Sequence, residues 1–297
     1  SAQDRLMARA LVLDDGTTRL AIVVVDNLMI PAELLDDAKQ LAQQATGIPT
    51  NRVLISATHT HSAPAAMGCL GSGADLEYQK FLPGQLAKAI ALAAENLSAA
   101  RIGWTIVQDH EHNHCRRWIF RSDRMAIDPF GEQNVRAHMH PGHQSPNHIG
   151  PSGPEDPDLS ILSVQTADGQ PLAVLANYAM HYYGATPLSA DFCGRFGGVL
   201  GDLIGASDVN PSFVGIMSQG TSGDSMWPDY SQPAGRNDIE AYTAEVAEVA
   251  KTAYEQIAYH DWVSLAMAEE KLRLRRRVPD EQRLAWARQT VASFAGR

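Results

Sequence analysis

The sequence predicts an α/β fold with a mixed β-sheet core and helices packed on its faces. Residues 20–25 form a continuous apolar run, which is typical of a strand buried on both faces of a sheet, and Arg52-Val53-Leu54-Ile55 predicts a short buried strand. Residues 31–46 carry apolar side chains at helical spacing, with Pro31 near the first turn. Up to residue 107 the order is strand, strand, helix, strand, helix, strand, which favours a mixed sheet covered by helices.

Turn sequences rich in aspartate and glycine join some of these strands directly. Asp14-Asp15-Gly16-Thr17 follows the apolar run at residues 6–13, and such a turn between two apolar runs predicts a hairpin. Ala167-Asp168-Gly169 joins residues 159–166 to residues 171–178 in the same way. The sequence therefore predicts two antiparallel hairpins, one near each end of the sheet-forming region.

The remaining elements follow from apolar periodicity. Residues 75–97 predict a helix, in which Pro83-Gly84 indicates a kink or a break into two pieces. The other predicted elements are a strand over 101–107, a helix over 195–204, a strand over 212–217, a long amphipathic helix over 239–257, a strand over 263–274 and a final helix from Asp280.

Residues 109–158 lack this periodicity and predict a long irregular loop. The segment is rich in proline, glycine, asparagine and histidine, and loops of this length inside a domain usually serve a function or move. Its histidines have no repeated ligand spacing, so we expect most of them at the surface. Arg116-Arg117-Trp118 can clamp an anionic or carbonyl oxygen, or the two arginines can form surface salt bridges. We expect the segment to lie beside the functional site and to contribute an arginine to it.

Composition excludes several classes of function. The chain has 297 residues and a net charge of -10, which argues against nucleic-acid binding and against electrostatic attachment to anionic lipid. No apolar run approaches the roughly 20 residues that span a bilayer. The three cysteines define no disulfide framework. We expect residues 1–297 to form a single catalytic domain that lacks N-terminal and C-terminal parts of a longer protein.

Polar residues follow three of the predicted buried strands. His59 and His61 come after the strand at 52–57, and they share one face if the backbone is still extended there. His181 ends the strand at 171–178, and a polar run that contains Asp224 follows the strand at 212–217. Two imidazoles aimed together suit metal binding or acid–base chemistry. The alternative is one histidine facing solvent and one satisfied by hydrogen bonds. Asp26 likewise ends a strand, where a cap or turn role is the simplest interpretation.

Together and in this order, the motifs resemble the N-terminal catalytic region of the neutral/alkaline (non-lysosomal) ceramidase family. The resemblance extends roughly from residue 5 to residue 229. Its most specific part is the His-Thr-His-Ser run with a later strand-end histidine. The motifs are Ser56-Ala57-Thr58-His59-Thr60-His61-Ser62, Gly153-Pro154-Glu155-Asp156-Pro157, Asn177-Tyr178-Ala179-Met180-His181, Ser189-Ala190-Asp191-Phe192-Cys193-Gly194 and Gln219-Gly220-Thr221-Ser222-Gly223-Asp224.

The resemblance implies a zinc amidohydrolase in which the metal activates water and polarises an amide carbonyl. His59 and His181 match the two zinc histidines, and His61 resembles the adjacent histidine that assists the site. One of Arg116 and Arg117 matches the active-site arginine of the family. The family completes its metal site with a Glu and a Tyr, which we expect outside this sequence. The family also favours an extracellular or periplasmic location and a role in sphingolipid metabolism.

Proton transfer and substrate choice are less determined. His61, Asp191 and Asp224 are the candidates for shuttling a proton. Ceramidases carry a serine two residues after the Gly-Asp pair, where this chain has Met226, and Ser225 stands one place earlier. The substrate is therefore expected to be a small-molecule or lipid-like amide, with ceramide in doubt. The sequence leaves the oligomeric state and the compartment open.

Two other functions compete with the metal hydrolase. The first is a serine hydrolase that uses Ser225 or Ser222 with a histidine and an aspartate, although the chain lacks the Gly-x-Ser-x-Gly elbow at this place. The second is a non-catalytic binding module that keeps the α/β scaffold without a complete site. A chelator separates the first two, since activity that survives complete removal of zinc rules out the metal mechanism.

Overall fold

Two β-sheets form the centre of the computed structural model, which describes residues 4–69, 71–206, 209, 212–235, 237–276 and 278–295. The first sheet has the order β1-β2-β3 and comprises β1 (Ala8–Asp14), β2 (Arg19–Val25) and β3 (Val53–Ala57). β1 and β2 are antiparallel, which confirms the first predicted hairpin, and β3 runs parallel to β2.

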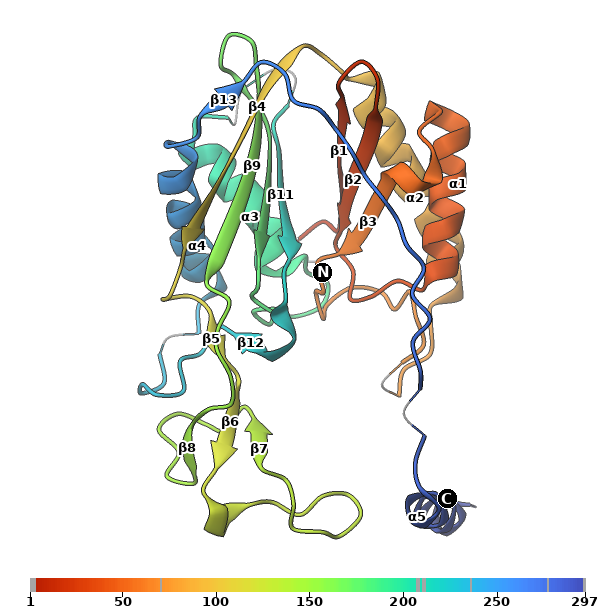
Figure 1. Ribbon diagram of the computed structural model, residues 1–297, viewed down its shortest axis with the longest axis vertical. Coiled ribbons are helices and arrows are strands. Elements are labelled where there is room, and N and C mark those ends of the chain that lie inside the picture. The colour runs from red at the N-terminus through yellow and green to blue at the C-terminus, as the bar shows by residue number, and fades with distance from the viewer. Residues whose placement is uncertain are drawn as a thin grey trace.

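The second sheet lies beside the first, and its edge strand β11 contacts β1 (Figure 1). Its order is β11-β10-β9-β4-β13, with parallel pairing between β10 and β11 and antiparallel pairing elsewhere. The antiparallel β9–β10 pair confirms the second predicted hairpin. The strands are β4 (Ala100–Gln108), β9 (Asp158–Thr166), β10 (Pro171–Tyr178), β11 (Val214–Gln219) and β13 (Tyr259–His260).

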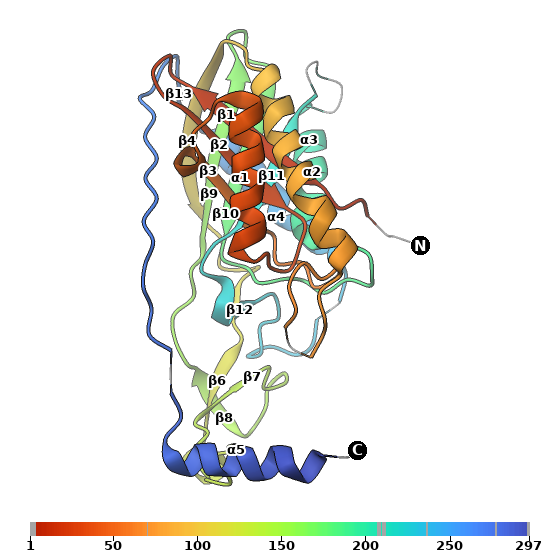
Figure 2. The ribbon, with the colours of Figure 1, turned by 90° about the vertical axis from the view of Figure 1, so that its right-hand side faces the viewer.

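Each sheet is covered by its own pair of helices. α1 (Ala32–Thr46) and α2 (Leu76–Glu95) pack on the first sheet, and α3 (Asp191–Leu203) and α4 (Ile239–Tyr254) pack on the second (Figure 2). The predicted α/β class with helices on a mixed core is therefore confirmed. Among the described helices, none has the length and apolar character needed to cross a bilayer.

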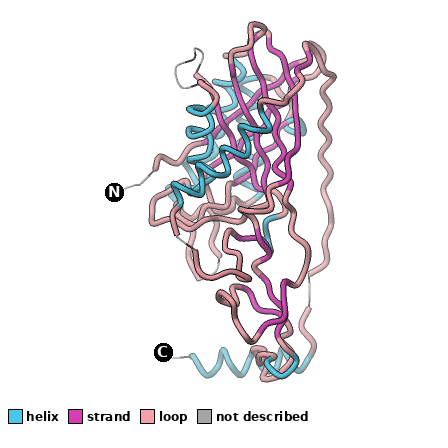
Figure 3. Tube along the Cα trace, turned by 90° about the vertical axis from the view of Figure 1, so that its left-hand side faces the viewer, coloured by secondary structure: helices cyan, strands magenta, loops and turns pink. Residues whose placement is uncertain are grey.

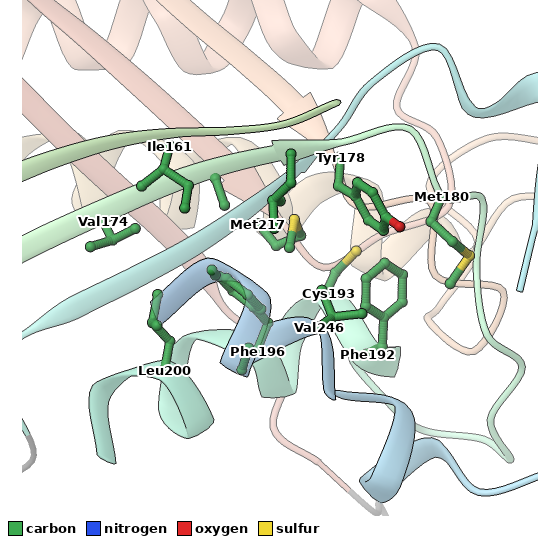
Figure 4. Packing of buried hydrophobic residues seen from close by; sticks show 14 of the residues in the cluster. Ile161, Val174, Tyr178, Met180, Phe192, Cys193, Phe196, Leu200, Met217 and Val246 are labelled. Atoms are coloured by element: carbon green, nitrogen blue, oxygen red, sulfur yellow. The ribbon is translucent and has the colours of Figure 1, made fainter. Parts of the chain in front are cut away.

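The apolar stripes predicted from periodicity form two cores. Leu82, Leu86 and Ile90 of α2 pack with Ala38 and Ala42 of α1 against the first sheet. In the second core, α3 and α4 pack against strands β9, β10 and β11, as Figure 4 shows. A smaller cluster joins the two sheets and consists of Leu11, Val24, Val164, Ala173 and Ile216.

Buried charge also links the two halves. Asp26 is fully buried, and both of its carboxylate oxygens lie 2.9 Å from Nη1 of Arg9. Nη2 of the same arginine donates to the carbonyl oxygen of Gly194 in α3, at 3.0 Å. Asp26 lies in the bend after β2, as a turn residue would, but it caps none of the described helices, and its carboxylate belongs to a buried ion pair.

Several element boundaries differ from the sequence expectations. α2 continues through Pro83 without the predicted break. α3 begins at Asp191, four residues before the predicted start at Arg195. Residues 263–274 were expected to form a strand, but they pair with no other strand in the described chain.

Residues 261–276, here called the strap, run instead along one side of the molecule as an extended loop (Figure 3). The strap is held by side-chain contacts. Asp15 accepts hydrogen bonds from Trp262 and Leu265, and Lys39 pairs with Glu269 at 2.6 Å. Beyond the strap, helix α5 (Glu281–Phe294) lies at the far end of the molecule, as Figures 1 and 2 show.

The segment 109–158, expected to be irregular, also contains short strands that its sequence pattern does not predict. Three of them form a small sheet with the order β7-β6-β8, which projects from the main body (Figure 1). A fourth, β5, forms a separate two-stranded antiparallel sheet with β12, a short strand that follows β11 in the chain. The short elements are β5 (His114–Cys115), β6 (Arg117–Phe120), β7 (Ala137–Met139), β8 (His148–Pro151), β12 (Ser225–Met226) and the 3-10 helices η1 (Thr50–Arg52), η2 (Ser122–Arg124) and η3 (Ser222–Asp224).

The contact between α3 and β11 requires glycine on both sides. A Cβ atom on Gly197 would lie 2.3 Å from the carbonyl oxygen of Gly215, so the helix and strand backbones touch directly. We therefore expect Gly197→Ala to lower the free energy of unfolding by about 2–3 kcal/mol, because the two backbones must separate. Urea denaturation monitored by circular dichroism measures this change.

Gly198→Ala is the matched control. A Cβ atom on Gly198 meets nothing within 4 Å, and alanine is the better helix former by up to about 1 kcal/mol. Gly198→Ala should therefore leave the stability unchanged or raise it. Equal stability of the Gly197→Ala and Gly198→Ala variants would contradict the close backbone contact.

Candidate metal centre at the ends of β3 and β10

Three histidines meet where strands of the two sheets end. His59 and His61 follow β3 of the first sheet, and His181 follows β10 of the second. One ring nitrogen from each lies within 4.8 Å of the others. The predicted proximity of His59 and His181 is confirmed, with ring centroids 4.6 Å apart. The sequence also suggested that the strands before His59, His181 and Asp224 end at one sheet edge. β10 and β11 are parallel neighbours in the second sheet, but β3 belongs to the first.

His59 adopts a left-handed backbone conformation that turns the chain into the cluster. β3 ends at Ala57, and His59 has a φ of 63°, so the backbone is not extended here and the condition for a shared strand face is not met. The left-handed residue brings His59 and His61 together instead, with Nε2 atoms 3.4 Å apart. A non-glycine residue in such a conformation costs roughly 1–3 kcal/mol, and such residues concentrate at functional sites.

Main-chain carbonyl groups hold two of the three imidazoles. Nδ1 of His59 donates to the carbonyl oxygen of Leu28, and Nδ1 of His181 donates to that of Ser222, both at 2.9 Å. Because Nδ1 must carry the proton in each case, Nε2 keeps its lone pair. Histidine ligands of metals are usually fixed in this way by a carbonyl or carboxylate group.

His61 is held differently. Its ring stacks on Tyr182, with centroids 3.7 Å apart and planes 15° from parallel. The only hydrogen-bond contact of His61 within the described part of the chain is the one between its Nε2 and His59. His61 is exposed, whereas His181 is buried with 8% of its surface accessible. His61 therefore has more freedom than its two neighbours.

The environment lowers the pKa of both His181 and His61, which favours the neutral form of these two rings at neutral pH. Burial, the positive charge of Arg116 and the neighbouring His59 together lower the pKa of His181 to about 4. Burial also lowers the pKa of His61, and the proximity of His59 adds to the effect. Neutral imidazoles can bind a metal without first releasing a proton.

The structure distinguishes the two candidate arginines. Arg116 is 8% exposed, and its Nε and Nη2 donate to the carbonyl oxygen of Gly223 at 3.2 and 2.7 Å. Its backbone N–H donates to the carbonyl oxygen of Asp224. Arg117 is exposed in β6. Arg116 is therefore the arginine next to the histidine cluster, since Gly223 adjoins the residue that holds His181.

The two candidate aspartates are placed unequally. The carboxylate of Asp191 accepts hydrogen bonds from the backbone N–H groups of Tyr183, Gly184 and Phe192, at 2.9, 3.0 and 2.7 Å. Asp191 is buried and thus fixes the loop that follows His181. Asp224 is exposed on η3. A proton-transfer role for either aspartate stays a prediction.

Among the described residues, no histidine forms a hydrogen bond with the side-chain hydroxyl group of Ser222 or Ser225. Ser222 donates its hydroxyl to Oε1 of Gln219 at 2.8 Å. Ser225 is buried in β12, where it pairs with Cys115 of β5, and Met226 pairs with His114. This arrangement gives the serine hydrolase alternative no support.

Aromatic residues near the cluster were not identified from the sequence. Tyr182 follows His181 directly, and its position beside a strand-end histidine could have indicated a role. The hydroxyl group of Tyr230 lies 2.6 Å from Nδ1 of His140, whose backbone N–H donates to the carbonyl oxygen of Arg116. No sequence signal connects Tyr230 with residues 90 positions earlier. All seven histidines of the 109–158 segment lie outside the cluster.

A cavity of about 1080 Å³ lies elsewhere, along β1 and α2. Its lining includes Met7, Phe81, Leu92 and Trp262, but none of the three clustered histidines. The site at the strand ends is therefore defined by its donor atoms and not by this cavity.

Asp191→Asn tests the anchoring of the loop after His181. Asparagine tolerates the left-handed φ of 58° at this position, but its amide group would direct N–H toward a backbone N–H. We expect the substitution to lower the free energy of unfolding by about 1–3 kcal/mol, measured by urea denaturation. Asp224→Asn, at the exposed aspartate, should change it by less than about 0.5 kcal/mol.

Comparison with solved structures identifies similar folds. The neutral ceramidase from Pseudomonas aeruginosa matches 84% of this chain with a TM-score of 0.61 and 19% sequence identity. A ceramidase complexed with C2 matches the same share with a TM-score of 0.57 and 19% identity. This chain covers 38% of each of these ceramidases. No protein-family model matches the chain, and no curated protein matches its sequence. The likeness establishes a ceramidase-like fold.

Proposed function

We propose that the chain carries the histidine part of the active site of a zinc-dependent hydrolase that cleaves an amide bond. The observation that carries the proposal is the set of three imidazole nitrogens within 4.8 Å, two of them on rings held by main-chain carbonyl groups. The ceramidase-like fold supports the same class of reaction, since both similar structures are ceramidases.

The donor set fits zinc. Zinc–nitrogen bonds of about 2.0–2.1 Å at tetrahedral angles place two ligand nitrogens about 3.4 Å apart. The Nε2 atoms of His59 and His61 are separated by 3.4 Å. Three protein nitrogens and one open position are the arrangement typical of catalytic zinc. Zinc bound there would act as a Lewis acid on the scissile carbonyl and lower the pKa of water to about 7.

His61 has two alternative roles in this proposal. In the first it is the third zinc ligand, beside His59 and His181. In the second, zinc takes a Glu and a Tyr as the family resemblance implies, and His61 accepts the proton from water. His61 is a better proton acceptor than Asp191, because the oxygens of that carboxylate already accept backbone hydrogen bonds. Arg116 would donate to an oxygen atom of the substrate.

The substrate need not be ceramide. Met226 occupies the position at which the ceramidase family has serine, and its side chain is buried with 6% exposed. A thioether gives no hydroxyl group to bind the polar part of ceramide. A site that binds a polar group of its substrate by a hydrogen bond discriminates strongly between ligands with and without that group, so the loss of the serine hydroxyl should change the substrate preference. We infer a small or lipid-like amide other than long-chain ceramide.

Metal analysis of single-histidine variants tests the site. We expect about one zinc per chain after dialysis, and His59→Ala or His181→Ala should reduce the retained metal at least tenfold by removing a ligand. His61→Ala in the full-length protein decides its role, because loss of metal identifies a ligand, whereas retained zinc without turnover identifies a proton acceptor.

His138→Ala serves as the control for these variants, since His138 is exposed and outside the cluster. Its zinc content should equal that of the unchanged protein. Equal zinc retention by the His59→Ala, His181→Ala and His138→Ala variants would refute the metal site. Hydrolysis that persists after complete removal of zinc by a chelator would refute the metal mechanism.

The two arginines should differ in their effect on turnover. Arg116→Ala removes a buried donor beside the cluster and should lower kcat/KM by about 100-fold, a magnitude common for the loss of one positioned donor. Arg117→Ala removes an exposed side chain and should change kcat/KM less than twofold. Steady-state kinetics on a panel of N-acyl substrates measures both values. Similar small effects of the two variants would contradict the placement of Arg116 at the site.

A further inference from the structure

Arg116 is a buried cation without an acidic partner. Only 8% of its surface is exposed, and its guanidinium donates to a single acceptor, the carbonyl oxygen of Gly223. Within the described ranges, no carboxylate oxygen forms an ion pair with it, and Nη1 forms no hydrogen bond. A buried charge is costly unless an opposite charge or further hydrogen bonds compensate for it.

Geometry places this cation beside the histidine cluster. Arg116 and His181 donate to consecutive carbonyl groups, those of Gly223 and Ser222, at 2.7 and 2.9 Å. The positive charge of Arg116 lowers the pKa of both His181 and His61, which agrees with this proximity. An oxygen atom bound by the guanidinium would therefore belong to a molecule that also reaches the histidines.

The surroundings supply little negative charge. Asp224 attracts Arg116, but its side chain is exposed. The carboxylate of Asp191 already accepts three backbone hydrogen bonds. Burial raises the pKa of the Tyr230 phenol, so this neighbour adds no negative charge at neutral pH. A divalent cation on the histidines would add more positive charge to this region.

We propose that Arg116 binds the carboxylate of the substrate, which makes the substrate class amides of amino acids or similar acids, such as N-acyl amino acids. The assignment rests on the proposed function, since it places this carboxylate next to the amide that is cleaved. A guanidinium with a free Nη1 matches an anionic oxygen better than a neutral hydroxyl, because a charge-assisted hydrogen bond is shorter and about twice as strong.

A matched pair of ligands tests the assignment without requiring turnover. N-acetylglycine and N-acetylglycinamide have nearly the same size, and only the first carries a carboxylate. Isothermal titration calorimetry on the chelator-treated protein should show at least about tenfold tighter binding of the acid, as expected for one charge-assisted hydrogen bond. The metal-free condition prevents direct binding of the carboxylate to zinc from imitating the effect.

Variants identify the residue responsible. Arg116→Gln should abolish the preference for the acid, and Arg116→Lys should keep part of it because the charge remains. Arg124→Gln, at an exposed arginine of the same segment, should keep all of it. Thermal unfolding of each variant shows whether it is folded. If Arg116→Gln does not fold, the affinities of the unchanged protein for N-acetylglycine and N-acetylglycinamide still test the proposal.

Two results would overturn the proposal. One is equal affinity of the unchanged protein for N-acetylglycine and N-acetylglycinamide, and the other is a preference that Arg116→Gln leaves intact. Inorganic phosphate as a third ligand would, if it binds more tightly than N-acetylglycine, assign a phosphate-bearing ligand instead of a carboxylate. Failure of zinc binding alone would refute the proposed function but leave the acid preference in place, so the two proposals can fail separately.

Discussion

A buried ion pair between Arg9 and Asp26 helps to join the sheet that delivers His59 and His61 to the layer of strands and helices that delivers His181. Arg9 lies in the first sheet, which delivers His59 and His61. Besides pairing with Asp26, it donates a hydrogen bond to the carbonyl oxygen of Gly194 in α3, a helix that covers the second sheet. Burial raises the pKa of Asp26, and the positive charge of Arg9 opposes this effect. Gly194 is required here, since a Cβ atom would lie 2.1 Å from that of Ala190. This charged contact acts together with the small apolar cluster between the sheets and with the hydrogen bonds from Thr60 to Ser189 and from Ser62 to Ala185.

Local patterns predicted those parts of the fold that local chemistry determines. Both hairpins follow from their aspartate- and glycine-containing turns, and the strand before His59 follows from its continuous apolar run. The strap and the strands of the 109–158 segment could not be predicted, because their structure comes from distant partners. Asp15, for example, binds the strap 250 residues later in the chain.

The candidate site was predictable in its residues but not in its geometry. Strand-end positions identified His59, His61 and His181, whereas the left-handed turn at His59 has no signal in a histidine side chain. The choice between Arg116 and Arg117 also needed the structure, since neighbouring residues point in different directions and only one of them is buried. Tyr182 and Tyr230 were missed because stacking and long-range hydrogen bonds leave no periodic pattern.

One short turn after β11 positions both the imidazole and the guanidinium of the site. Consecutive carbonyl groups at Ser222, Gly223 and Asp224 accept from the His181 ring, the Arg116 side chain and the Arg116 backbone. The β5–β12 pairing fixes the direction of that turn, and Gly220 lies so close to Ala179 that a side chain would strain the contact. The spacing between the guanidinium of Arg116 and the ring of His181 therefore depends on consecutive main-chain carbonyl groups. For a substrate that contacts both Arg116 and His181, the distance between these two groups would change little with side-chain motion.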